Sequence, residues 1–125
     1  MKTLQKTIYL FTILFLASCS KDSSTSTDAK TLFKGNWSGE QQIDGVANPY
    51  AFDLIIYQDD TVKNTDLAFN SEIFPGSYTY TNDSIKINYN NGTKWKLKFS
   101  NNYASATGIV LGAQGATGTV TMSKN

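Results

Sequence analysis

Hydrophobic and polar residues alternate along much of the chain with the two-residue period that is typical of β-strands. The clearest stretch is Lys94–Ser100, where apolar residues alternate with lysines. The apolar residues are Trp95, Leu97 and Phe99, and the lysines are Lys94, Lys96 and Lys98. Because successive side chains of a strand point to opposite faces, the pattern predicts one buried face and one solvated face. Ser84–Tyr89 alternates in the same way, and the Asn-Asn-Gly sequence between the two stretches is typical of a hairpin turn.

The same pattern extends over the rest of the domain, with turn residues recurring between the apolar stretches. We expect strands at Asn36–Ile43, Pro49–Gln58, Thr61–Asn64, Gly76–Thr81, Ser84–Tyr89, Lys94–Ser100, Tyr103–Val110 and Ala116–Met122. The segment Thr65–Pro75 fits a lid-like loop, a short helical turn or a bulged strand. No stretch has a sustained helical period, so the sequence predicts an all-β fold. We expect a small antiparallel up-and-down β-barrel of about eight strands, which closes to remove its sheet edges.

The N-terminus has a different character from the strand-forming domain. Lys2 and Lys6 precede an apolar run that ends at Leu16, and small residues separate Leu16 from Cys19. The four residues concerned are Leu16, Ala17, Ser18 and Cys19. They resemble the lipobox of a bacterial lipoprotein signal, which is cleaved before the cysteine after lipid is attached to its thiol. A membrane-spanning helix would need roughly 20 apolar residues, and the run here is much shorter.

This resemblance implies a signal peptide over residues 1–18 and a lipid-anchored mature protein. Residues 19–31 hold the lipidated Cys19 and a stretch of Ser, Thr, Asp and Lys, a composition that predicts a flexible tether. The β-barrel domain is expected over residues 32–125. The sequence Ser20-Lys21-Asp22 resembles the export signals of surface lipoproteins in Bacteroidota. We therefore expect an outer-membrane location, on the cell surface or on the periplasmic face.

Charge and composition narrow the chemistry of the mature chain. Two of the eleven lysines and none of the ten acidic residues lie in the signal, which leaves nine lysines against ten acids and no arginine. This near-neutral balance predicts no nucleic-acid partner. The chain has no histidine and a single cysteine, so we expect no metal site, no cofactor and no enzymatic activity. The acidic residues Asp53, Asp59, Asp60 and Asp66 lack the spacing of a calcium loop, which favours solvated turns.

The sequence Gly35-Asn36-Trp37 opens the first expected strand and follows Leu32 and Phe33. It resembles the first strand of lipocalins and other calycins, including small lipocalin-like domains found in Bacteroidota lipoproteins. This resemblance implies that Trp37 packs across the closed end of a barrel and that Gly35 allows close approach of the backbone there. The family often places an arginine of the last strand over the tryptophan, and Lys124 is the basic residue near that position in this chain.

An eight-stranded barrel is just wide enough to be filled by its own side chains or to hold one small ligand. The residues expected to point inward are Phe52, Leu54, Ile56, Tyr78, Tyr80, Ile85, Ile87, Tyr89, Trp95, Leu97, Phe99, Val120 and Met122. If a small apolar or amphipathic ligand enters the barrel, we expect it among Tyr78, Tyr80, Ile85, Ile87, Trp95, Leu97 and Phe99. The alternative is a packed barrel that binds a protein or glycan through its surface. The aromatic residues expected outside the core are Tyr50, Tyr57, Phe74 and Tyr103.

Overall fold

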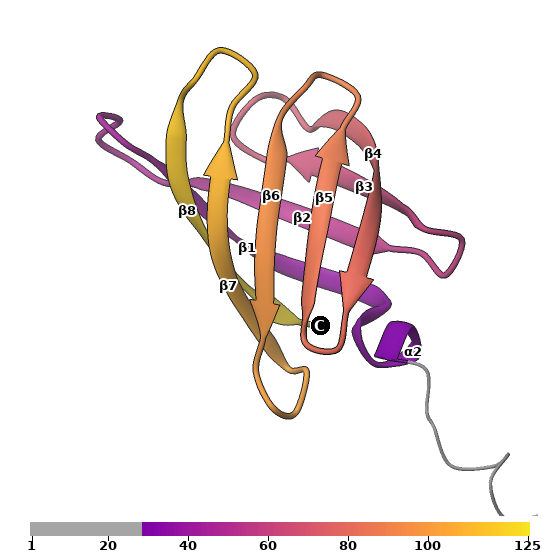
Figure 1. Cartoon of the computed structure of the whole chain (residues 1–125). Coiled ribbons are helices and arrows are strands. Elements are labelled where there is room, and N and C mark those ends of the chain that lie inside the picture. Colours follow the sequence, from indigo (N-terminus) through magenta and orange to yellow (C-terminus); the bar gives the residue numbers. More distant parts are fainter. Residues whose placement is uncertain (1–28) are drawn as a thin grey trace, which may run out of the picture.

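Eight antiparallel strands close into a single barrel in the computed structural model of the chain, which describes residues 29–125 (Figure 1). Each strand pairs with its neighbours in the sequence, and β1 also pairs with β8 to complete the closure. This confirms the predicted all-β, antiparallel up-and-down β-barrel. The signal peptide, the lipobox and residues 19–28 of the tether lie outside the described residues.

The elements follow the alternation pattern closely. They are α2 (Ala29–Phe33), β1 (Gly35–Ile43), β2 (Tyr50–Ile56), β3 (Thr61–Asp66), β4 (Glu72–Thr81), β5 (Ser84–Tyr89), β6 (Lys94–Phe99), β7 (Ser105–Leu111) and β8 (Thr117–Lys124). The bounds of β5 are those predicted, and most other strands differ from the prediction by a few residues at their ends. Gly45 and Gly92, in two of the predicted turns, have positive φ angles of 82° and 91°, which glycine adopts without steric strain.

The segment Thr65–Pro75 is neither a lid-like loop nor a helical turn. β3 continues to Asp66 and β4 begins at Glu72, so the two strands form a tight hairpin with a short turn over residues 67–71. Asn70 and Ser71 in this turn have positive φ angles of 53° and 58°. The sequence pattern missed this hairpin because its turn contains neither glycine nor proline.

The short helix α2 was not expected from the sequence, which assigned Ala29, Lys30 and Thr31 to the tether. The helix precedes β1 and lies against one end of the barrel (Figure 1). Its contacts with the barrel include an ion pair and a buried ring. The Lys30 ammonium pairs with the Asp60 carboxylate at 2.5 Å, and the Phe33 ring is fully buried. The folded domain therefore begins before the predicted start at residue 32.

The core is formed by the inward-pointing residues of every strand. Residues alternate between buried and solvent-facing along β5 and β6, and Lys94, Lys96 and Lys98 are exposed as predicted. Tyr80 is a correction to the predicted core, because its side chain is 38% exposed. Tyr80 lies near the end of β4, where its ring meets Phe33 of α2 at 5.5 Å between centroids and is not enclosed by the barrel wall.

The two ends of the barrel are built differently. At the lower end in Figure 1, α2 covers the opening, and the ring of Phe33 stacks on that of Phe99 at 5.1 Å. The upper end carries the turns after β1, β3, β5 and β7, and no helix of residues 29–125 lies over it (Figure 1). We call this upper end the mouth. Within residues 29–125, no helix has the length and apolar character needed to cross a membrane.

Candidate binding site at the barrel mouth

A cavity of about 180 Å³ opens at the mouth of the barrel. It is lined by Gln41, Ile43, Asn64, Asp66, Phe74, Tyr89, Asn91, Thr93, Trp95, Val110 and Gly112. A dry cavity of about 150 Å³ in another protein is large enough to hold benzene, so this space suits a molecule of similar size. The lining mixes aromatic rings with polar side chains, whereas the rest of the barrel interior is mainly apolar.

Asn64 is the first unusual residue of this lining. It lies in β3, points inward between Val62 and Asp66, and is only 5% exposed. Its Nδ2 donates a hydrogen bond to the hydroxyl oxygen of Tyr89 at 3.3 Å, while its Oδ1 has no hydrogen-bond partner within the described residues 29–125. A buried carbonyl oxygen without a partner costs about 1–3 kcal/mol of desolvation. A ligand that donates a hydrogen bond to Oδ1 would recover this free energy.

Trp95 is the second unusual residue. The alternation of β6 directs its indole inward, where it meets the ring of Phe52 at 4.9 Å and that of Tyr89 at 5.2 Å between centroids. The side chain is 1% exposed, and its Nε1 has no hydrogen-bond partner in the part of the chain that the structure describes. Indole Nε1 can only donate a hydrogen bond. Asn64 Oδ1, an acceptor, and Trp95 Nε1, a donor, are thus two fully buried polar atoms of the cavity lining that have no partner among residues 29–125.

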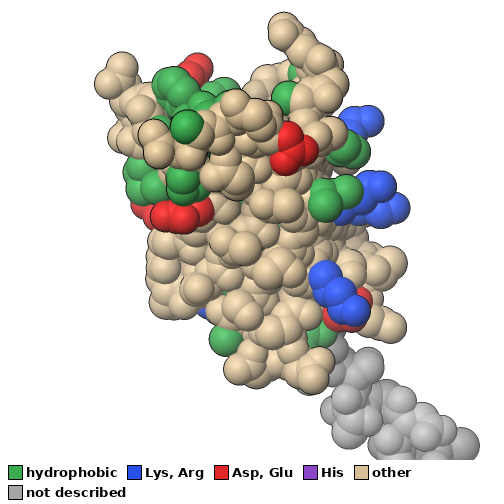
Figure 2. Space-filling view, turned by 90° about the vertical axis from the view of Figure 1, so that its left-hand side faces the viewer, with side chains coloured by type: hydrophobic (Ala, Val, Ile, Leu, Met, Phe, Trp, Pro, Cys, Tyr) green, Lys and Arg blue, Asp and Glu red, His purple; other side chains and the backbone are tan. Residues whose placement is uncertain are grey.

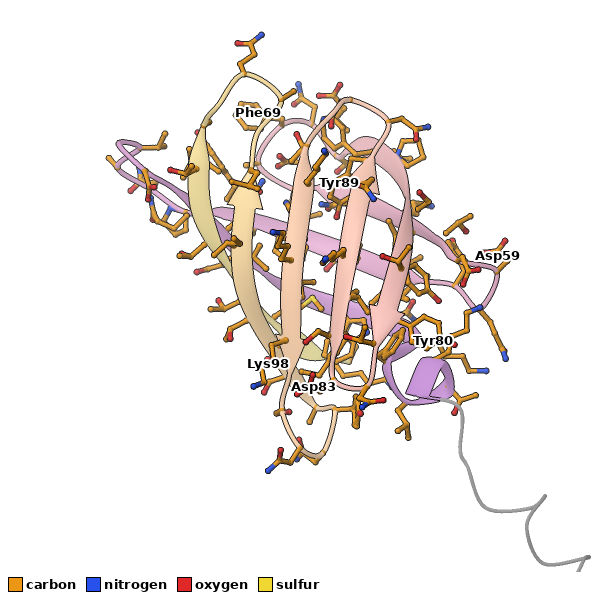
Figure 3. All side chains as sticks on the ribbon, in the orientation of Figure 1. Asp59, Phe69, Tyr80, Asp83, Tyr89 and Lys98 are labelled. Atoms are coloured by element: carbon orange, nitrogen blue, oxygen red, sulfur yellow. The ribbon has the colours of Figure 1, made fainter. Side chains whose placement is uncertain are left out.

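Tyr89 lies beside both of these residues near the mouth (Figure 3). Burial raises the pKa of the Tyr89 phenol far above its ordinary value, and the hydrogen bond from Asn64 lowers it by a smaller amount. The phenol is therefore neutral throughout the physiological pH range, and its oxygen accepts the hydrogen bond from Asn64 Nδ2.

Asp66 adds a charge to the lining. It ends β3, is 7% exposed, and its Oδ1 accepts a hydrogen bond from the backbone N–H of Ala68 at 2.9 Å. Glu72 is its direct partner in the register of the β3–β4 pair, so two acidic residues are opposed at the rim. Neither of the ion pairs found within residues 29–125 includes Asp66 or Glu72, and no lysine is among the lining residues.

Asn64 was not identified from the sequence, and Asp66 was wrongly assigned to a solvated turn, although the positions of both residues in the strand carried a signal. Val62 points inward, and the two-residue period of β3 puts Asn64 and Asp66 on the same face. Apolar character alone does not identify them, because the inner face here becomes polar toward the mouth. If the alternation of β3 is extended past Val62, both residues are predicted to point into the barrel.

Among the seven residues predicted to hold a ligand, Trp95 lines the mouth cavity. Five others, Tyr78, Ile85, Ile87, Leu97 and Phe99, are at most 4% exposed and pack in the core. Tyr80 lies at the opposite end of the barrel (Figure 3). The structure thus does not bring the seven together around the mouth cavity, because the strand period sets the face of a side chain but not its height in the barrel.

Trp37 is fully buried near α2, at the end away from the mouth. Its indole Nε1 donates a hydrogen bond to the backbone oxygen of Phe33 at 2.8 Å. The Lys124 ammonium lies 5.7 Å from the centroid of the Trp37 ring and donates a hydrogen bond to the backbone oxygen of Leu32. Gly35 opens β1 with a φ of 128°, and a Cβ there would lie 3.3 Å from the Lys124 side chain. These residues close the lower end of the barrel and do not line the mouth cavity.

The four aromatic residues expected outside the core have different environments. Tyr57 is 40% exposed, whereas Phe74 and Tyr103 pack partly against the core. The ring of Tyr50 meets that of Phe69 at 5.2 Å between centroids. Phe69 is labelled near the mouth in Figure 3, and Figure 2 shows hydrophobic side chains gathered at this end of the face it displays. Leu67, Phe69 and Ile73 in and beside the β3–β4 turn are 47%, 53% and 54% exposed.

The acidic side chains of the described chain do not form a cluster. No group of three or more acidic, histidine or cysteine side chains within residues 29–125 is arranged to hold a metal ion. The acidic residues considered for calcium are dispersed. Asp53 accepts a hydrogen bond from Ser38 on the outer face, and Asp59 accepts one from Thr61 in the β2–β3 turn, which lowers the pKa of the Asp59 carboxyl.

The chain thus forms a closed eight-stranded β-barrel that is covered at one end by a short helix and has a partly polar cavity at the other. Its fold is similar to that of a solved, redesigned β-barrel, with a TM-score of 0.59 and 16% sequence identity. The alignment covers 82% of this chain and 99% of the redesigned barrel. No family model and no curated protein matches the chain. The likeness supports the fold and carries no information about function.

Proposed function

We propose that this chain is a lipid-anchored, extracytoplasmic binding protein that holds a small amphipathic molecule at the mouth of its barrel without changing it chemically. The observation that carries this proposal is the pair of buried, unpaired polar atoms on two residues of one cavity, Asn64 Oδ1 and Trp95 Nε1. Binding sites of small molecules combine apolar walls with a few well-placed polar groups, and this lining has that composition.

The cavity volume limits the size of the ligand. About 180 Å³ is small beside the roughly 300–1,000 Å³ of pockets for drug-sized ligands. A long acyl chain would therefore have to displace core residues. A compact molecule with both hydrogen-bonding and apolar groups fits the lining without such rearrangement. The proposal thus narrows the predicted apolar or amphipathic ligand to a small amphipathic one.

The lipobox supports the proposed location of this binding protein at a membrane surface. The lipobox residues Leu16, Ala17, Ser18 and Cys19 are the basis for proposing an outer-membrane lipoprotein, on the cell surface or the periplasmic face. The lipocalin-like relationship is proposed on the Gly35 and Trp37 motif together with the up-and-down barrel.

Native mass spectrometry of the protein extracted from its own membrane tests the binding proposal. We expect the wild type to carry a small molecule that the Asn64→Leu variant lacks, because leucine removes the unpaired acceptor and fills part of the cavity. Asn88→Leu is the matched control, since Asn88 lies on the exposed outer face of β5. Two results together would contradict the proposal: a wild type that carries no molecule, and an Asn64→Leu variant that is more stable than the wild type. They would show that Asn64 and Trp95 are core residues whose polar atoms bind only water.

A surface-binding function is the second candidate. The exposed apolar side chains Leu67, Phe69 and Ile73 favour it, since they offer a protein or glycan a hydrophobic contact beside the mouth. Replacing Phe69 by serine would weaken such a contact and leave the cavity lining intact, so the two functions respond to different substitutions.

A further inference from the structure

The mouth cavity contains a buried carboxylate with no cationic side chain in its lining. Asp66 is 7% exposed, and neither ion pair found within residues 29–125 involves it. A buried charge is expensive unless it is paired or hydrogen-bonded. The hydrogen bond from the Ala68 N–H uses Oδ1 and leaves the negative charge without an opposite charge.

The surroundings of Asp66 make a positive charge beside its carboxylate more favourable. Glu72 lies directly opposite across the strand pair, and like charges in that position destabilise a sheet. The lysines of β6 lie on the outer face, so the strand period keeps Lys94, Lys96 and Lys98 out of the barrel interior. The mouth therefore combines negative charge with a lining free of lysine, among the residues that the structure describes.

The neutral groups of the lining match the same kind of ligand. Asn64 Oδ1 is a second hydrogen-bond acceptor, so the lining offers a carboxylate and an amide oxygen to an N–H-rich cation. The aromatic rings of Phe74, Tyr89 and Trp95 also line the cavity, and aromatic faces attract cations. Trp95 Nε1 is a buried donor with no acceptor among residues 29–125, which suits an uncharged oxygen on the ligand.

We propose that the mouth cavity selects a small organic cation: a protonated amine that pairs with Asp66 and Asn64 Oδ1, joined by a short chain to an oxygen that accepts from Trp95 Nε1. This inference rests on the proposed binding function and specifies the ligand class of the same cavity. An anion is disfavoured by Asp66 and Glu72, and a neutral molecule leaves the charge of Asp66 unpaired.

Two probes that differ only at the charged atom test this selectivity. Diethanolamine carries a protonated amine between two hydroxyethyl arms, and diethylene glycol replaces that amine by an ether oxygen. The full chain, labelled with ¹⁵N-tryptophan and held in detergent micelles, would be titrated with each probe at constant ionic strength. The chain has two tryptophans, so the indole N–H signal of Trp95 reports the cavity, and that of Trp37, bonded to Phe33, is an internal control.

We expect diethanolamine to shift the Trp95 indole signal saturably and to bind about tenfold or more tightly than diethylene glycol, the difference typical of a charged hydrogen bond. Asp66→Asn should remove this preference. Asparagine keeps an Oδ1 that can accept from the Ala68 N–H, so the β3–β4 turn is retained. Asp83→Asn is the matched control, because Asp83 lies at the opposite end of the barrel (Figure 3) and should leave the preference unchanged.

Glu72→Gln provides a second variant that does not alter a buried residue, since Glu72 is exposed at the rim. It should reduce the amine preference by a smaller factor, about twofold, because the charge is more distant and solvated. Equal binding of both probes that Asp66→Asn does not change would overturn the cation proposal while leaving a neutral-ligand function intact. Absence of any Trp95 shift with diethanolamine would also overturn it, and native mass spectrometry would then judge the binding function separately.

Discussion

At the scale of single residues, the two tryptophans have contrasting environments although both are buried. Trp37 donates a hydrogen bond from its Nε1 to the backbone oxygen of Phe33, whereas the Nε1 of Trp95 has no partner among the described residues. Trp37 thus joins α2 to the barrel wall, and Trp95 contributes a donor to the mouth cavity. Substitutions of the two tryptophans should therefore have different effects.

Replacing Trp37 by alanine should lower the free energy of unfolding by about 3–5 kcal/mol, the usual range for a large buried aromatic side chain. The loss combines a cavity in the core with the missing bond to Phe33, and chemical denaturation would measure it. Trp37→Phe should cost less because most of the ring volume remains. A near-neutral Trp37→Ala variant would contradict the packing of this end of the barrel.

The burial of Tyr89 predicts that the folded protein loses stability at alkaline pH. Because burial raises its folded-state pKa above the unfolded value of about 10, the neutral phenol contributes stability that is present below pH 10 and is lost as the pH rises above it. Tyr89→Phe should therefore flatten the decline of stability above pH 10, measured by denaturation at several pH values. Burial also raises the pKa of Tyr78, so part of the decline should remain.

The exposed Tyr57 provides a control for this experiment. Tyr57→Phe should leave the alkaline decline as it is in the wild type, because the Tyr57 side chain is 40% exposed. At neutral pH, Tyr89→Phe should be slightly destabilising, since Asn64 Nδ2 loses its acceptor. An unchanged alkaline profile in Tyr89→Phe would contradict the burial of this phenol.

At the scale of elements, the close contact of neighbouring strands depends on glycines. A Cβ at Gly108 of β7 would overlap the backbone oxygen of Lys96 and lie 2.9 Å from the Cα of Leu97, both in β6. Gly108→Ala should therefore separate β6 from β7 and lower the stability by about 1–3 kcal/mol, the usual cost of overpacking. Thermal denaturation would measure the loss.

Thr107→Ala is the control for Gly108→Ala, because Thr107 is the preceding residue and its side chain is exposed on the outer face of β7. It should change the stability by less than about 0.5 kcal/mol, as is usual for surface substitutions. A Gly108→Ala variant as stable as Thr107→Ala would show that the two strands lie farther apart.

The strands could be predicted from the sequence because their periodicity is local. Ser84–Tyr89 was predicted with the bounds that the structure has, since each apolar residue of that stretch has a polar neighbour. The helix α2 could not be predicted in this way. It spans five residues, and its position depends on distant contacts of Lys30 with Asp60 and of Phe33 with Phe99. The cavity residues Asn64 and Asp66 were missed because inward-pointing positions were identified by apolar character alone.

At the scale of the whole molecule, the two ends of the barrel differ, because α2 lies against one end and a cavity opens at the other. The described chain begins at α2, beside the closed end, and the mouth lies at the opposite end (Figure 1). A tether that leads from Cys19 to α2 would thus attach the barrel to a membrane by its closed end. This arrangement would leave the mouth open to the aqueous phase.

The anchor itself is tested by Cys19→Ala. The substitution should abolish incorporation of radiolabelled palmitate and move the protein from the membrane fraction to the soluble fraction, or leave an uncleaved precursor. Acyl chains contribute about 0.8 kcal/mol per buried methylene, so two or more of them hold a protein stably on a bilayer. Ser23→Ala, in the same polar stretch, should leave the labelling unchanged. Palmitate incorporation that survives Cys19→Ala would exclude this cysteine as the attachment point.

Closure of the sheet has a consequence for a protein held at a surface. Anchoring confines neighbouring copies to two dimensions, where they collide far more often than in free solution. Open sheets under such crowding can join through their unpaired backbone groups and grow into fibrils. Here β1 is paired with β8 over seven residue positions, so the first and last strands of the sheet have no unpaired edge between them. If the proposed lipid anchor holds this barrel on a bilayer, neighbouring copies would therefore meet without an open sheet edge through which their strands could pair.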